Sequence, residues 1–160
     1  AACAGPGTLL KGTLRVSKYN AANSFVQLEG TTRRVLVPPS EVNRALCGDK
    51  VAVQLLPEAD WAGPSPAFSA GGEDAPAGGG ERMPTGRVVG VLERTDKLLV
   101  ATFQADDSLN LERGNTEWIL AVPLDPRFPK VRLRTRQAAQ LMDSRVVVRA
   151  DGWEPSSRYP

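Results

Sequence analysis

The feature of this sequence that most constrains its fold is a series of short runs in which apolar and polar residues alternate. In residues 10–18, Leu10, Leu14 and Val16 fall on one face with Gly12, while basic and polar residues fill the other. This two-residue period is that of a strand buried on one side only. Similar runs at 24–28, 34–37, 50–56 and 86–92 are separated by turn residues such as Gly, Pro and Asn. The sequence therefore predicts an all-β fold.

The order of these runs predicts a particular barrel. A short helical turn, capped by Ser40 and continuing through Leu46, is expected between the third and fourth strands, and a long loop follows the fourth. This is the order of the five-stranded OB fold. The pattern repeats with strands at 97–103, 118–122, 130–135 and 145–150 and a short helix at 136–142. We therefore predict two tandem OB-fold barrels, the second truncated because a fifth strand is lacking.

The composition of one segment predicts a disordered loop within the first domain. Residues 62–83 contain six Gly, three Pro, five Ala and two Ser, too little apolar surface to offset the entropy of ordering, so this loop between strands four and five is predicted to be disordered. The expected organisation is a disordered tail at 1–6, a first OB domain at 7–95 and a second, incomplete one at 96–160.

The residue types present exclude several kinds of chemistry. The chain has no histidine, which removes Ser/His and Cys/His catalysis and histidine metal sites. The acids Asp106, Asp107, Glu73 and Asp74 lie in polar or disordered loops without further clustered ligands, so no metal site and no catalytic residue is predicted. Cys3 and Cys47 form no motif and are expected to be reduced thiols.

The hydropathy of the chain also bears on its partners. No run approaches the roughly 18 apolar residues that a membrane span needs, so no membrane partner is expected.

Charge is unevenly distributed along the chain. Residues 127–149 hold seven basic residues against one acid, so this segment carries +6 while the net charge of the whole chain is only +2. Such an asymmetry favours a surface that faces a polyanion.

The sharpest local signal is a basic ladder, formed by Lys130, Arg132, Arg134 and Arg136. On a strand these side chains share one face and lie about 6.6 Å apart, a spacing suited to phosphates of an extended single strand. The alternative is a solvated outer face of an edge strand that is protected by charge.

Aromatic side chains are sparse near the other basic positions. OB folds that hold single strands combine basic and aromatic side chains, which makes Lys11, Arg15, Lys18 and Tyr19 a second candidate group. Phe25 is expected in the core, and Trp61, Trp118 and Trp153 are expected to close barrel mouths. The complete set of candidate RNA-binding residues is Lys11, Arg15, Lys18, Tyr19, Lys130, Arg132, Arg134, Arg136 and Arg149.

Four blocks, in order, resemble one family. They are residues 43–57 with Trp61, residues 84–90, residues 127–133 and residues 145–153; the closing residues 157–160 agree as well. Together they resemble the paired cold-shock (OB) domains of the eukaryotic exosome-associated exoribonuclease of the RNB family, a relative of bacterial ribonucleases II and R. Glu154 departs from the pattern, because many members have Pro there.

The resemblance implies a role in RNA degradation and rRNA processing. Family members degrade RNA hydrolytically from its 3′ end, with magnesium held by aspartates of an RNB domain that is absent here, so no cofactor is expected in this chain. The cold-shock domains guide single-stranded RNA inward, and exosome core subunits are expected partners of the parent protein. The run Val146–Arg149 resembles the mainly cytoplasmic paralogue, which favours the cytoplasm over the nucleus.

Two functions remain open at this stage. The leading one is a single-stranded RNA-binding module of an exoribonuclease. The alternative is an OB-fold protein-interaction module whose charged strand meets an acidic partner surface, since the fold alone does not decide between them.

Overall fold

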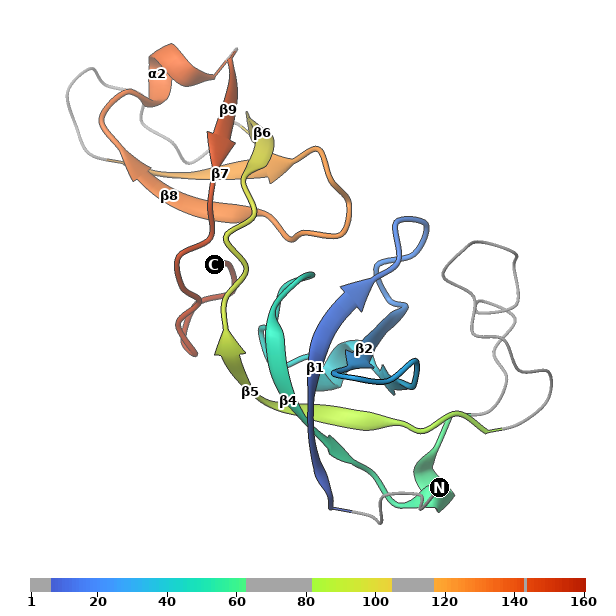
Figure 1. Cartoon of the computed structure of the whole chain (residues 1–160). Coiled ribbons are helices and arrows are strands. Elements are labelled where there is room, and N and C mark those ends of the chain that lie inside the picture. Colours follow the sequence, from blue (N-terminus) through green and yellow to red (C-terminus); the bar gives the residue numbers. More distant parts are fainter. Residues whose placement is uncertain (1–6, 63–81, 105–116, 143) are drawn as a thin grey trace. The chain divides into compact units, whose positions relative to one another are not determined.

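A computed structural model describes residues 7–62, 82–104, 117–142 and 144–160 (Figure 1). The chain divides into two units, Ala1–Thr95 and Asp96–Pro160. The predicted tail at 1–6, most of the predicted disordered loop (63–81) and the acids Glu73, Asp74, Asp106 and Asp107 lie outside the described residues. Within them, no helix is long and apolar enough to cross a membrane.

The first unit is a five-stranded antiparallel sheet whose two ends meet. Its strands are β1 Leu9–Val16, β2 Ser24–Leu28, β3 Arg34–Val37, β4 Lys50–Leu55 and β5 Gly86–Glu93, in the order β3-β2-β1-β4-β5. A parallel bridge between Leu36 and Thr85 joins β3 to the start of β5, and the Leu36 N–H donates to the Pro84 carbonyl at 2.8 Å. This closure confirms the predicted five-stranded OB barrel.

Strand β1 belongs to both halves of this barrel. Gly12 pairs with Leu28 of β2 on one side and with Val51 of β4 on the other, and Figure 1 shows β1 as a long, curved strand. A Cβ atom at Gly12 would lie 2.4 Å from the Gln27 carbonyl oxygen. Glycine is therefore required here by the close approach of β2.

The core of the first unit follows the predicted alternation. Leu14, Val26, Val35, Val51 and Val53 are at most 1% exposed and pack in one cluster. In β4 every second residue is buried and the residues between are half-buried. The two-residue period of the sequence thus places the inner face of this barrel correctly.

The second unit has four described strands. These are β6 Leu99–Gln104, β7 Glu117–Pro123, β8 Val131–Thr135 and β9 Arg145–Val148, in the order β8-β7-β6-β9. Ile119 and Ala121 of β7 are buried to 1% and 0% exposure, but Leu133 and Val146 are only half-buried. Leu133 therefore faces the core as predicted without being fully enclosed by it.

The helical segments are shorter than predicted. Between β3 and β4 lies the 3₁₀ turn η1 Pro39–Glu41, in which Ser40 is an interior residue and not a cap. Asn43 and Arg44 have φ angles of 47° and 60°, which a right-handed helix cannot accommodate, so the expected helix through Leu46 is wrong. Between β8 and β9, α2 spans Ala138–Leu141. A further 3₁₀ turn, η2 Glu58–Asp60, was not predicted.

The ends of the Gly- and Pro-rich stretch are ordered. Ala62 and Met83 form an antiparallel bridge, and the Ala62 N–H donates to Thr85 Oγ1 at 2.8 Å. The disorder predicted from residue 62 to residue 83 is therefore wrong at both ends.

Candidate nucleic-acid interface

An arginine lies over an aromatic ring in the same strand register in both units. In the second unit, Arg132 of β8 places its guanidinium carbon 4.3 Å from the Trp118 ring centre. In the first, the Arg34 guanidinium lies 4.7 Å from the Phe25 ring centre. Trp118 pairs across the strands with Arg134, and Phe25 pairs with Leu36. In each unit the arginine therefore lies two residues before the residue that pairs with the aromatic side chain. The register of the second and third strands thus builds the same cation–π pair twice.

The two aromatic rings differ in exposure. Phe25 is 7% exposed, whereas Trp118 is 52% exposed. Trp118 pairs across the strands with Arg134, which lies on the outer face of the sheet, so Trp118 lies on that face as well. The prediction that Trp118 closes a barrel mouth is therefore wrong. The sequence carried a signal for this position: the neighbours Ile119 and Ala121 alternate with Trp118 and fill the inner face.

Phe25 does not lie among the inner-face residues either. It pairs directly with the exposed Arg15 of β1, and directly opposed residues of antiparallel strands point to the same side of a sheet. Phe25 is therefore on the outer face of β2, outside the cluster around Leu14, but at 7% exposure it is one of the buried hydrophobic residues, so the prediction that it is a core residue is confirmed. Its burial includes contact with the Arg34 guanidinium.

The basic ladder is partly formed on β8. Arg132 and Arg134 are exposed on the strand, and Val131 between Lys130 and Arg132 is buried. Lys130 precedes the strand, and its ammonium group binds the Gln104 side-chain oxygen. Arg136 is exposed just after the strand ends. The structure therefore brings Arg132 and Arg134 together on one face of the strand, beside Trp118.

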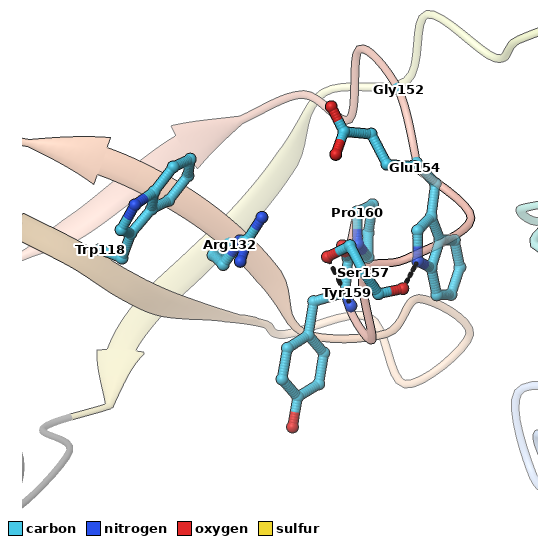
Figure 2. Close-up of a pocket in the computed structure, with 8 residues that line it drawn as sticks. Trp118, Arg132, Gly152, Glu154, Ser157, Tyr159 and Pro160 are labelled. Carbon is cyan, nitrogen blue, oxygen red and sulfur yellow. Dashed lines mark hydrogen bonds between the residues drawn. The ribbon is translucent and has the colours of Figure 1, made fainter.

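A pocket of about 370 Å³ opens beside the Trp118–Arg132 pair (Figure 2). Strands β7 and β8 contribute Trp118 and Arg132. The segment after β9 contributes the remaining wall, which consists of Gly152, Trp153, Glu154, Ser157, Tyr159 and Pro160. In OB folds, oligonucleotides bind on the face of the second and third strands and at the loop after the fourth. The pocket lies at the corresponding place in this unit.

Hydrogen bonds hold the wall of this pocket against β8. The Arg132 backbone N–H donates to the Pro160 carbonyl at 2.8 Å. In the first unit the Leu36 N–H donates to the Pro84 carbonyl, two residues further along the third strand than Arg34, the counterpart of Arg132. Trp153 Nε1 donates to the Ser157 carbonyl at 2.9 Å, and Ser157 Oγ donates to the Tyr159 carbonyl at 2.6 Å. The wall is thus organised before any ligand binds.

The remaining candidate residues do not line this pocket. Lys11 forms an ion pair with Glu29 at 3.4 Å, and Arg149 forms one with Asp151 at 2.8 Å. Lys18 and Tyr19 are exposed in the turn after β1, where the Tyr19 residue is 89% exposed. With Lys11 and Arg15, Lys18 makes the outer face of the first unit basic.

One carboxylate anchors the turn between β7 and β8. Asp125 accepts hydrogen bonds from Arg127 Nε and Nη2 at 2.9 and 2.7 Å, and Lys97 Nζ lies 2.8 Å from it. The Arg127 guanidinium, assisted by Lys97, holds the pKa of the Asp125 carboxyl group well below its usual range. Arg127 therefore stabilises the turn. The exposed positive charge beside the pocket includes Arg132, Arg134 and Arg158, whose guanidinium carbon lies 5.5 Å from the ring centre of Tyr159 in the pocket wall.

The described residues contain no cluster of three or more potential metal ligands. Cys47 is a buried free thiol.

The fold and the site define a class of protein. A closed five-stranded barrel followed by a related four-stranded sheet, with aromatic and arginine side chains on the second and third strands of each, is a tandem OB-fold module of the cold-shock type. A family model for the Rrp44-like cold shock domain matches residues 3–72, and one for the Dis3-like cold-shock domain 2 matches residues 118–160. The chain belongs to the Dis3/Rrp44 family and contains its first and second cold-shock domains.

Curated relatives agree with this assignment. The exosome complex exonuclease dis3 of Schizosaccharomyces pombe is 34% identical over 177 residues, which cover 99% of this chain and 18% of the relative. The human exosome complex exonuclease RRP44 is 33% identical over 174 residues, covering 96% of this chain and 18% of the relative. The chain thus spans 18% of the length of these relatives.

A solved structure supports the fold. The structure of yeast Ssd1, a pseudonuclease, has a TM-score of 0.65 and 22% sequence identity. It covers 95% of this chain and 22% of the Ssd1 chain.

Proposed function

We propose that this chain is the single-stranded RNA-binding and RNA-guiding module of a 3′-5′ exoribonuclease of the RNA exosome. The observation that carries the proposal is the pocket beside Trp118 and Arg132, which combines an exposed aromatic ring, a guanidinium plane and a preformed wall. Single-stranded nucleic acids are held by such combinations of stacking surfaces and positive charge.

The parts of the site have separate tasks. The exposed Arg132 and Arg134 lie two residues apart on β8, about 6.6 Å along the strand, and their forked donors suit phosphate oxygens. Trp118 is 52% exposed as a residue, and its ring offers a surface on which a base can stack. Phosphate contacts hold the strand in place without reading its sequence. The outer face of the first unit, with Arg15 and Arg34, offers a second surface for the same task.

The family supports the biological setting. The relatives named above are exosome complex exonucleases, so the same proposal includes RNA degradation by the parent protein and its association with exosome core subunits. Hydrolysis would belong to that parent protein and not to the residues of this chain. A cytoplasmic location, with the nucleus as the alternative, is part of the proposal.

A binding experiment separates this function from the protein-interaction alternative. We expect a short single-stranded RNA of about 12 nucleotides to bind more tightly than a duplex of the same sequence and more tightly than polyglutamate of similar charge. Trp118→Ala should weaken single-strand binding by about 10- to 100-fold, because stacking on an aromatic ring contributes roughly 1–3 kcal/mol per base. If polyglutamate binds as tightly as RNA and Trp118→Ala changes neither affinity, an acidic protein partner is the better account.

A further inference from the structure

The pocket beside Trp118 contains an acid that a purely phosphate-binding surface would not need. Glu154 lines the pocket on the wall opposite the strands. In Figure 2 its carboxylate extends from the terminal segment toward the side where Trp118 and Arg132 are drawn. In the part of the chain that the structure describes, no ion pair or side-chain hydrogen bond engages this carboxylate.

Electrostatics decides which part of an RNA this acid can face. A carboxylate repels phosphate, so Glu154 weakens any binding mode that brings the backbone against it. A carboxylate is also an acceptor with two oxygens, and its favourable partners are therefore N–H and O–H donors. The O–H donor of RNA is the ribose 2′-hydroxyl, which is the same in every nucleotide and does not distinguish one base from another. The N–H groups of single-stranded RNA lie on the base edges, which single-strand binding proteins read while the base stacks on an aromatic or guanidinium plane.

We propose that the pocket formed by Trp118, Arg132 and Glu154 is a guanine-selective base site. This inference rests on the proposed RNA-binding function and specifies the ligand of the same site. Guanine presents two adjacent donors, N1–H and the N2 amino group, that match the two oxygens of one carboxylate. Adenine and cytosine present one amino group beside an acceptor, and uracil presents one N–H between two carbonyl groups. Only guanine can therefore donate two parallel hydrogen bonds to Glu154 while it stacks against the Trp118–Arg132 pair.

The size of the site agrees with a single base. A volume of about 370 Å³ is at the small end of pockets that hold small ligands. The wall that carries Glu154 is fixed to β8 through the bond between the Arg132 N–H and the Pro160 carbonyl. Stacking surface and acceptor are thus held in one unit of the chain.

The test compares oligouridylates of about ten nucleotides that differ at one central base, titrated against the complete chain. The guanosine oligomer should bind about tenfold more tightly than the adenosine oligomer, the order of discrimination expected from one bidentate contact. Inosine, which keeps N1–H and lacks the amino group, should lose most of this preference. Glu154→Gln should bring the guanosine oligomer within about threefold of the adenosine oligomer.

Asp151→Asn is the matched control. It removes the same charge three residues away, from a side chain that pairs with Arg149 and does not line the pocket, so the guanosine preference should persist. Equal binding of all oligomers to the wild-type chain, or a preference that survives Glu154→Gln, would overturn the guanine site while leaving the RNA-binding proposal intact. Failure of every oligomer to bind would overturn both.

Discussion

Arg132 lies over the ring of Trp118 at 4.3 Å, two residues along β8 from the position that pairs with Trp118. The first unit repeats this relationship with Arg34 and Phe25. The difference between the two units is exposure, because Phe25 is covered and Trp118 is open. One unit therefore uses its aromatic residue for packing, and the other presents it to solvent.

This difference predicts opposite responses to alanine substitution. Phe25→Ala should lower the free energy of unfolding by about 3 kcal/mol, the usual cost of removing a buried phenyl ring. Trp118→Ala should cost about 1 kcal/mol or less, because half of the side chain is already in water. Denaturant unfolding followed by circular dichroism measures both. A Trp118 variant as unstable as the Phe25 variant would show that Trp118 has a structural role.

The crowded position in β1 gives a second stability prediction. At Gly12 an added methyl group would meet the Gln27 carbonyl oxygen at 2.4 Å, so Gly12→Ala should destabilise the first unit by about 1–3 kcal/mol through overpacking. Gly90→Ala is the control, since a Cβ atom at Gly90 would meet no other atom within 4 Å. Thermal melts of the two variants should differ clearly, and equal melting would mean that β2 can move away from β1 at little cost.

The Asp125 carboxylate predicts a pH dependence. Its pKa is lower in the folded state than the usual value near 4, so the stability it contributes is present above about pH 4 and is lost as the pH falls toward the folded-state pKa. Asp125→Asn should be less stable than wild type by about 2 kcal/mol at neutral pH. The difference should shrink below about pH 4. A stability difference that stays constant from neutral pH to about pH 3 would contradict this role.

The chain by itself should not cleave RNA. It has no histidine, and its described residues contain no group of three potential metal ligands. Labelled RNA incubated with the purified chain and magnesium should therefore stay intact. Processive shortening that a substitution within this chain abolishes would refute this expectation.

Strand positions were predictable from the sequence because burial on one face imposes a two-residue period. Leu14, Val51 and Val53 were placed correctly in this way, as were the exposed Arg132 and Arg134. The helical turn after Pro39 is shorter than the sequence predicts, because local sequence does not reveal the positive φ angles of Asn43 and Arg44.

The candidate site was predicted only in part. The arginines of β8 follow from alternation, but the pocket depends on contacts between distant segments. The bond from the Arg132 N–H to the Pro160 carbonyl joins residues 28 positions apart, and no local pattern indicates it. The position of Trp118 at the start of a strand predicts a residue at the barrel mouth, whereas its alternation with the buried Ile119 predicts the outer face, where it lies.

The salt dependence of RNA binding tests the central claim most directly. The measurement compares the wild-type chain with a triple variant, Arg132→Gln, Arg134→Gln and Arg136→Gln, and with a control that loses the same charge from the exposed residues Arg33, Arg87 and Arg145. Each single-strand phosphate contact contributes roughly 0.7 to the slope of log affinity against log salt. The slope of the triple arginine variant should therefore be smaller in magnitude than that of wild type by about 2. The affinity of the triple variant should fall by about the same factor for single-stranded oligomers made only of uridine, only of cytidine or only of adenosine, which all lack guanine. The control should keep a slope close to that of wild type. A folded triple variant with unchanged affinity and slope would contradict RNA binding at this face and favour an acidic protein partner.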